Sequence, residues 1–222
     1  MGYESRDLAA GFRKAMRAIE TSSLHLAELG WAIPMFLTPA EVRQLLEGAA
    51  PHSIDERFIE LYESNDQAYF NEMAERLVTR ANLRPWRTLL RQAASAYRRR
   101  QFVITVPALM IVCEGVLMAD QGRRTDLRNV VSTYVQQVER DLPDSLTLVI
   151  WRTVERFVDQ LYMRSDFDGP RPGMLNRHWI LHGRDSAAWT HADSLRMFQA
   201  VDTVSNIAEL REGPNKRIQR TP

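Results

Sequence analysis

The amino-acid sequence predicts an all-α protein. Apolar residues recur at intervals of three or four positions through most of the 222 residues, and several of these segments begin with a residue typical of helix N-termini. No segment shows the strict alternation of apolar and polar residues that marks a half-buried strand. Hydrophobic residues make up 45% of the chain and charged residues 26%, which is the composition of a folded globular protein rather than a disordered one.

The first predicted helix runs from Leu8 to Leu29 and ends at Gly30. Its apolar residues are spaced to form one inward face: Leu8, Phe12, Ala15, Ile19 and Leu26. The next stretch, Trp31–Leu37, is predicted to be an apolar connector that covers the core. It cannot be helical throughout, because Pro34 restricts the backbone of the residue before it.

The next two helices have recognisable starts. Thr38 is followed directly by Pro39 and, three residues after the threonine, by Glu41, which is the pattern of a capping box. That helix is expected to end near Gly48. A longer helix is predicted over residues 53–79, with a break near Ser64-Asn65-Asp66 because these residues favour turns.

A helix predicted from Pro85 ends at three consecutive arginines, Arg98, Arg99 and Arg100. Arginines interleaved with aromatic residues can bind RNA, through phosphate contacts and base stacking. The same pattern is also typical of a solvated helix face whose last turn carries favourable positive charge. The sequence leaves both interpretations open.

Pro107 is predicted to open the helix 108–119, which is apolar on nearly all sides and is therefore expected to be a central, buried helix. Glu114 is the exception. A carboxylate buried alone is costly, so we expect Glu114 to be paired or to belong to a site.

The second half of the chain continues with three further helices. They are predicted to begin at the capping residues Thr125-Asp126, Ser145 and Thr190, and to end near Arg140, Leu161 and Leu210. Three segments are expected: an N-terminal helical extension (1–83), a helical bundle (84–211) and a disordered basic tail (212–222) that follows the chain-breaking Gly213-Pro214.

Several functional classes find no support in the sequence. Cys113 is the only cysteine and lies in an apolar run, so we expect a small core residue in a reducing compartment. The first residues lack the apolar segment of a signal peptide, and the window 102–119 contains Pro107 and Glu114, so we expect a cytoplasmic protein without a membrane span. The formal net charge is only +1, which argues against an extensively basic surface.

The segment 176–183 carries the strongest chemical signal, Asn-Arg-His-Trp-Ile-Leu-His-Gly. The Gly/Pro-rich run 169–173 ends what precedes it, so a helix is expected from near Met174, with Arg177, His178 and His182 in its first turns. Free N–H groups at such a helix start favour an anion, phosphate above all.

The spacing of these side chains suits phosphodiester chemistry. His178 and His182 lie about 40° apart on one helix face, since successive residues are rotated by about 100°. Arg177 can grip phosphate oxygens with two hydrogen bonds, and histidine transfers protons near neutral pH. A structural interpretation stays open as well, in which His182 and Gly183 terminate the helix and Arg177 is a surface residue.

The arrangement Arg177-His178-x-x-x-His182 resembles the R-[N/D/H]-x(3–5)-H signature of the HEPN superfamily, small all-helical domains found in bacterial toxins and phage-defence proteins. The stretch from Tyr97 through Gly115 is similar to the helix that precedes this motif helix in HEPN-like proteins. The resemblance implies an antiparallel helical bundle over residues 84–211. It also implies that a polar residue of the preceding helix faces the Arg/His pair, and Glu114 is our candidate.

By this resemblance we expect a metal-independent endoribonuclease of a bacterial defence, abortive-infection or toxin–antitoxin system, acting on RNA as a homodimer, with a cognate antitoxin or defence partner. Arg177 would hold the phosphate, His182 would transfer protons, and His178 and Asn176 would orient His182 or the RNA. The arginines at 98–100 would contribute to RNA binding.

Two alternatives remain. One is a catalytically silent helical module that binds a protein or nucleotide. The other is a metal site at His178 and His182, for which His191 and Asp193 are the only further ligand candidates nearby. A metal site is disfavoured because no glutamate follows His178, so no cofactor or metal is expected.

Overall fold

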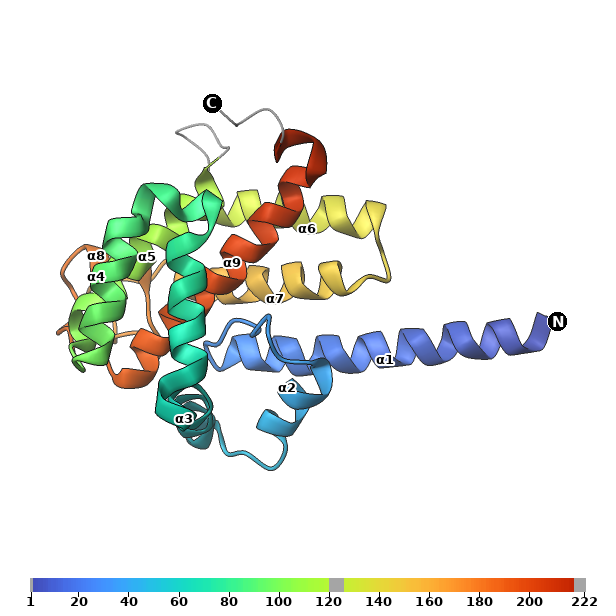
Figure 1. Cartoon of the computed structure of the whole chain (residues 1–222), viewed down its shortest axis with the longest axis horizontal. Coiled ribbons are helices and arrows are strands. Elements are labelled where there is room, and N and C mark those ends of the chain that lie inside the picture. Colours follow the sequence, from blue (N-terminus) through green and yellow to red (C-terminus); the bar gives the residue numbers. More distant parts are fainter. Residues whose placement is uncertain (1, 120–125, 218–222) are drawn as a thin grey trace.

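Every regular element of the described chain is a helix, so the predicted all-α class is confirmed. The computed structural model describes the backbone of residues 2–119 and 126–217, and the side chains of residues 10–119 and 126–209. Figure 1 shows the helices packed into one body from which the first half of the N-terminal helix projects. In chain order the elements are α1 (Gly2–Glu28), α2 (Pro39–Leu46), α3 (Pro51–Thr79), the 3-10 helix η1 (Ala81–Trp86), α4 (Arg87–Arg98), α5 (Phe102–Met118), α6 (Leu127–Asp141), α7 (Leu146–Leu161), α8 (Arg177–Leu181) and α9 (His191–Arg217).

The inward face expected for α1 is buried only in its second half. Leu26 is fully buried, but 54% of Phe12 is exposed and Ala15 is exposed as well. The reason is geometric: α1 packs along α7, and its first half extends past the end of α7 (Figure 1). Leu8 lies outside the residues whose side chains are described.

The capping box predicted at Thr38 and the break predicted within α3 are confirmed, whereas α1 and α3 begin at Gly2 and Pro51, earlier than the predicted Leu8 and Ser53. The side chain of Thr38 accepts a hydrogen bond from the backbone of Glu41 at 3.3 Å, and Glu41 accepts one from the Thr38 backbone at 2.7 Å, which completes a capping box. Within α3 the backbone leaves the helical conformation at Ser64, and Asn65, Asp66 and Gln67 have positive φ angles. The break therefore extends one residue further than predicted.

The start predicted for α5 at Pro107 is wrong. The helix begins at Phe102, because Arg100 has a φ of +59° and turns the chain there, and Pro107 lies inside the helix. Pro107 is the sixth residue of the helix, so it removes the hydrogen bond that its N–H would donate to the carbonyl of Val103, and this local cost does not prevent the helix from beginning at Phe102.

The expectation of a central, buried helix is confirmed for one face of α5 only. Its core face packs on α9, but Ile104 is 60% exposed and Ile111 is 50% exposed. These two residues are seven positions apart and so lie on the same side of the helix.

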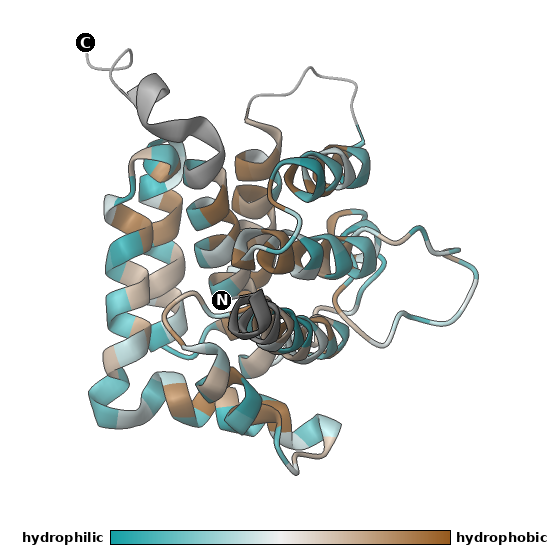
Figure 2. Cartoon of the chain, turned by 90° about the vertical axis from the view of Figure 1, so that its right-hand side faces the viewer, coloured by the Kyte–Doolittle hydropathy of each residue, from teal (hydrophilic) through white to brown (hydrophobic). Residues whose placement is uncertain are grey.

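Both halves of the chain contribute to one hydrophobic core. Leu26 and Trp31 from the predicted extension belong to the same buried cluster as Leu109 of α5 and Val201 of α9. The helix faces that meet in the interior are apolar, as Figure 2 shows. Residues 26–83 are therefore part of the body in which the motif is held.

The tail from residue 212, for which disorder is expected, begins inside the last helix. Helix α9 continues through Gly213-Pro214 to Arg217, whereas residues 218–222 lie outside the described chain. A proline in a helix deprives one carbonyl of its donor and costs stability, but it does not by itself end the helix.

Candidate functional site

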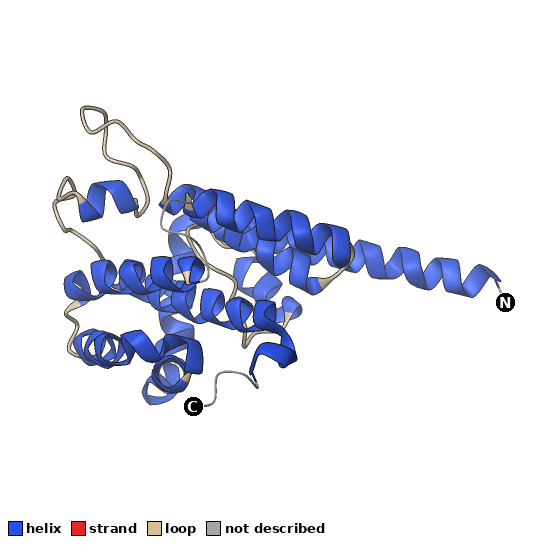
Figure 3. Cartoon of the chain, turned by 90° about the horizontal axis from the view of Figure 1, so that it is seen from above, coloured by secondary structure: helices blue, strands red, loops and turns tan. Residues whose placement is uncertain are grey.

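The motif lies on a short helix between two long segments without regular structure. Helix α8 spans only Arg177–Leu181, after the connecting residues 162–176 and before residues 182–190. Figure 3 shows this short helix and its connections at one end of the body. The longer helix expected from Met174 is absent, because the chain stays extended until Asn176, whose φ and ψ are −132° and 122°.

Asn176 shapes the start of α8. Its side-chain oxygen accepts hydrogen bonds from the backbone N–H groups of His178 and Trp179, at 3.0 and 3.2 Å. Its side-chain nitrogen donates to the carbonyl oxygen of Met163 at 2.8 Å, and the residue is only 1% exposed. The expected anion site on free N–H groups is therefore not formed, since Asn176 occupies two of them.

Arg177, the first residue of α8, reaches Glu114 of α5. Its Nε donates to Oε2 of Glu114 at 3.2 Å and its Nη2 donates to Oε1 at 3.4 Å. The hydroxyl of Tyr162 donates to the same carboxylate at 3.4 Å. The predicted proximity of Glu114 to Arg177 is thus confirmed, and about a third of the Glu114 side chain remains exposed.

The two histidines of the motif lie side by side. The rings of His178 and His182 are nearly parallel, with an angle of 2° between their planes and 6.1 Å between their centres. His182 also caps the C-terminus of α8, since its N–H donates to the carbonyl of His178 at 3.1 Å and Gly183 follows with a φ of +67°. The ring of His182 is exposed and meets the edge of Phe167.

A cavity of about 230 Å³ opens beside the Arg177–Glu114 pair. Its lining comprises Glu114, Met118, Asp126, Leu127, Arg128, Tyr162, Arg164, Arg177 and His178. We call it the motif pocket. Burial lowers the pKa of His178, and electrostatic interactions with Arg177, His182, Arg164 and Arg128 lower it further. His178 is therefore a neutral imidazole at pH 7, and it lines the motif pocket whereas His182 does not.

Two arginines of the motif pocket were not predicted. Arg128 lies in the first turn of α6 and is 3.9 Å from Asp126, while Arg164 follows the end of α7 and forms no ion pair within the described residues. Neither belongs to a recognisable motif, since both are single arginines that only the packing of α6 and α7 brings to the pocket. Together with Arg177 they make the pocket attractive to an anion.

The arginines predicted to bind RNA lie elsewhere. Arg98, Arg99 and Arg100 precede the start of α5, and twelve residues separate Phe102 from Glu114, which is about 18 Å along a helix. Arg98 donates to the side-chain oxygen of Asn71, and Arg100 lies over the ring of Phe102. None of the three lines the motif pocket.

Tyr97, one of the two aromatic residues interleaved with the arginines of this helix, is buried. Tyr97 is 1% exposed and its hydroxyl lies 3.0 Å from Glu63 and 2.8 Å from His191. It is therefore not available to stack on a base. His191, one of the candidate metal ligands, also contacts Glu63 at 2.7 Å.

The described residues offer neither a metal-binding cluster nor a reactive thiol. Within residues 10–119 and 126–209 no group of three or more histidine, cysteine, aspartate or glutamate side chains is placed to hold a metal ion. Cys113 is fully buried, and burial raises the pKa of its thiol to about 12, so it is a core residue. No helix of the described chain has the length and apolar character needed to cross a membrane.

Comparisons with known proteins found no match to a protein-family model, to a curated protein or to a solved structure.

Proposed function

We propose that the chain is a metal-independent endoribonuclease that resembles the HEPN superfamily and acts in a bacterial defence or toxin–antitoxin system. The observation that carries the proposal is the contact between Arg177 and Glu114 at a pocket that His178 also lines. It joins the motif to a carboxylate far away in the sequence, in a cavity with more arginines than carboxylates.

Arg177 is suited to hold the scissile phosphate. A guanidinium carries five N–H donors, and only two of those on Arg177 are used by Glu114, so donors remain for phosphate oxygens. Glu114 limits the orientations of the guanidinium before a substrate arrives. Arg164 and Arg128 would hold the neighbouring phosphates of the RNA strand.

The two histidines supply proton transfer. His178, neutral at pH 7, accepts the proton of the ribose 2′-OH as its oxygen attacks phosphorus. His182, whose ring centre lies 6.1 Å from that of His178, gives the proton of its imidazolium form to the 5′ oxygen as the phosphorus–oxygen bond breaks. The products are a 2′,3′-cyclic phosphate and a 5′-hydroxyl, and DNA is not cut because it lacks the attacking hydroxyl.

The exposed side of α5 supports the expected homodimer. Ile104 and Ile111 form an apolar stripe, and Glu114 lies one turn beyond Ile111 at its edge. A second copy packed on this stripe would bring two motif pockets to one RNA groove. Ile111→Asp should then give a monomer in light-scattering measurements and a large loss of cleavage.

The test of the function is cleavage of a structured RNA in the presence of EDTA. Wild type should produce cyclic-phosphate ends, and Arg177→Ala should reduce the rate by about 100- to 1,000-fold, since it removes a donor to the charged transition state. His178→Ala and His182→Ala should each reduce the rate by about 100-fold or more. His52→Ala and Arg84→Ala, at exposed positions away from the motif pocket, serve as matched controls.

Two outcomes would contradict the enzyme. If wild type is inert on several RNAs as monomer and as dimer, the silent binding module becomes the better account. If all variants cleave as fast as wild type, the activity does not come from this site.

A further inference from the structure

A second cavity, of about 300 Å³, is lined in part by the loop that precedes α8. Its lining comprises Gly30, Asp55, Phe157, Gln160, Leu161, Arg171, Gly173, Met174, Leu175, Ala188, Thr190, Asp193 and Arg196. We call it the loop pocket. Its volume falls at the lower end of the range of small-molecule sites, about 300–1,000 Å³.

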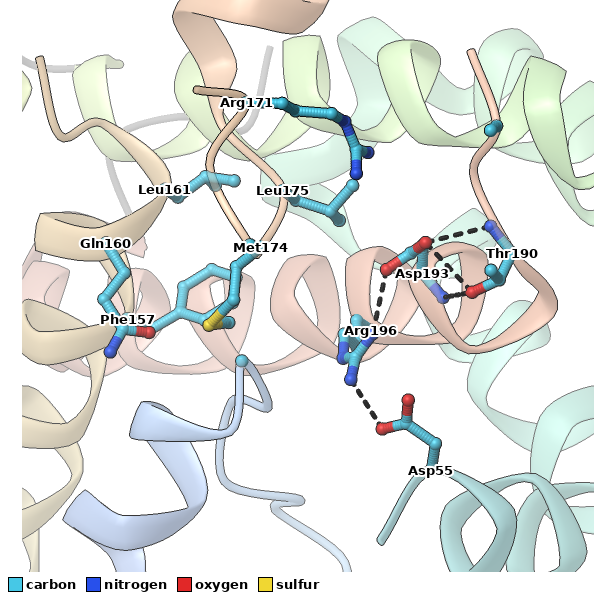
Figure 4. A pocket seen from close by; sticks show the side chains of 13 residues that line it. Asp55, Phe157, Gln160, Leu161, Arg171, Met174, Leu175, Thr190, Asp193 and Arg196 are labelled. Carbon is cyan, nitrogen blue, oxygen red and sulfur yellow. Dashed lines mark hydrogen bonds and ion pairs between the residues drawn. The ribbon is translucent and has the colours of Figure 1, made fainter. Parts of the chain in front are cut away.

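The loop pocket has an apolar side and a polar side (Figure 4). Phe157 and Leu161 of α7 gather with Met174 and Leu175 of the loop on one side, which also holds the polar side chain of Gln160. The side chains of Asp193, Arg196 and Asp55 lie opposite them. The two sides come from segments far apart in the sequence. Such a division suits a ligand with an apolar body and one polar end.

The charges on the polar side do not cancel. Arg196 is shared between Asp55 and Asp193, which it contacts at 2.5 and 2.8 Å. Arg171 is held by Asp185 through two hydrogen bonds of 3.1 Å, and only 3% of the Asp185 side chain is exposed. Both arginines are therefore neutralised, and one carboxylate charge is left over.

Asp55 holds that unbalanced charge where a ligand can reach it. Its Oδ1 accepts hydrogen bonds from Arg196 and from the indole N–H of Trp31, whereas Oδ2 accepts none from the described residues. Its side chain is 30% exposed, and Figure 4 shows the second oxygen directed away from the bond to Arg196.

Two polar atoms in the lining of the loop pocket form no hydrogen bond within the described residues. Oε1 of Gln160 and Nε of Arg196 are buried and have no partner within the described residues. Native proteins leave few buried polar atoms unpaired. The N–H groups of a cation can donate to Oε1 of Gln160, whereas Nε of Arg196 is a donor that a cation leaves unpaired. An anion is disfavoured, because the three carboxylates of Asp55, Asp185 and Asp193 outnumber the two arginines with which they pair.

We propose that the loop pocket binds a small organic cation with an aromatic or aliphatic body. Its charged nitrogen group lies at Asp55 and its body packs against Phe157, Leu161 and Leu175. This site does not depend on ribonuclease activity. A ligand there would touch Gly173–Leu175, the residues just before the cap of α8, and would order the chain that leads to the motif.

Binding of benzamidine and of benzoate to the full chain tests the proposal. The two probes have the same ring and a similar planar group, but opposite charge. In titrations followed by calorimetry or NMR, benzamidine should bind at least about tenfold more tightly than benzoate. Asp55→Asn should weaken benzamidine binding by about tenfold or more, and Asp141→Asn, which removes an exposed carboxylate at the end of α6, should leave it unchanged.

Ala188→Phe tests the site independently of Asp55, in case Asp55→Asn unfolds the protein. Ala188→Phe adds volume to the wall of the loop pocket without changing a charge, and it should abolish benzamidine binding. Equal or tighter binding of benzoate overturns the proposal, as does benzamidine binding that survives Ala188→Phe. The absence of saturable binding by either probe also overturns it.

Discussion

Glu114 on α5 and Arg177 on α8 are 63 residues apart in the chain, yet their side chains meet at 3.2 Å. The contact links a predominantly apolar helix to the one short helix that carries the motif. Both side chains line the motif pocket and are partly exposed, so a ligand in the pocket can reach them. Because water screens a partly exposed ion pair, this pair contributes only about 0–1 kcal/mol to the free energy of unfolding. Its importance for the proposed reaction is the orientation of Arg177.

Glu114→Gln tests that orienting role. Glutamine keeps a similar shape but loses the charge that holds the guanidinium, so RNA cleavage should fall by about 10- to 100-fold with little change in thermal unfolding. The decrease should be in kcat more than in KM if Glu114 positions Arg177 without touching RNA. A cleavage rate equal to wild type would remove Glu114 from the site.

The pH profile should report His178. Because burial and neighbouring cations lower its pKa below the ordinary 6.5, the acidic limb of kcat/KM should have its midpoint below pH 6.5. Between the lowered pKa of folded His178 and the ordinary value of 6.5, the folded protein binds fewer protons than the unfolded chain. The contribution of His178 to the free energy of unfolding is therefore fully present above pH 6.5 and is lost as the pH falls through the folded pKa.

Arg164→Gln tests whether neighbouring positive charge lowers the pKa of His178. Removing a cation near His178 should raise its pKa and move the acidic limb to higher pH, whereas Arg84→Gln should leave the limb in place. NMR titration of the His178 ring measures the same shift without RNA. A shift in the opposite direction would contradict the electrostatic assignment.

Asn176→Ala should destabilise the protein by about 0.5–2 kcal/mol, since the cap of α8 loses its acceptor. Asn176→Ser should lose less, because its hydroxyl can still accept a hydrogen bond from the helix N-terminus although it cannot reach Met163. Urea unfolding measures the difference. If both variants match wild type in stability, Asn176 does not act as a cap.

Gly115→Ala should destabilise by about 1–3 kcal/mol, although alanine is the better helix former. A Cβ at this position would overlap Cζ2 in the ring of Trp86, and a ring cannot bend aside as a flexible chain end can. Gly11→Ala is the matched control, because its Cβ would meet no atom within 4 Å. That variant should stabilise α1 by about 0.5–1 kcal/mol.

Helical class, most helix starts and the break in α3 are predictable from the sequence because they depend on local chemistry. Thr38 and Glu41 satisfy each other within four residues, and Ser145 caps α7 by the same kind of contact. The start of α5 is not predictable from Pro107 alone, because the turn at Arg100 precedes it. Whether HEPN-type chemistry occurs stays a prediction.

The site depends on contacts between helices. A polar partner for the motif was predictable from a carboxylate in an apolar helix, but Arg128 and Arg164 enter the motif pocket only because α6 and the end of α7 pack beside α5. The same packing leaves Arg98–Arg100 at the opposite end of α5. The loop pocket was not predictable, since its walls come from α3, α7, α9 and the loop before α8.

The sequence by itself determined that the chain is helical, where most helices begin, and that Arg177, His178 and His182 share one short segment. These features follow from propensity, capping and spacing, which act over a few residues. Only the tertiary structure decided that Arg177 meets Glu114, that His178 rather than His182 lines the motif pocket, and that Asp55 and Asp193 share Arg196. Burial and charge pairing depend on which distant segments pack together, and local spacing does not specify that.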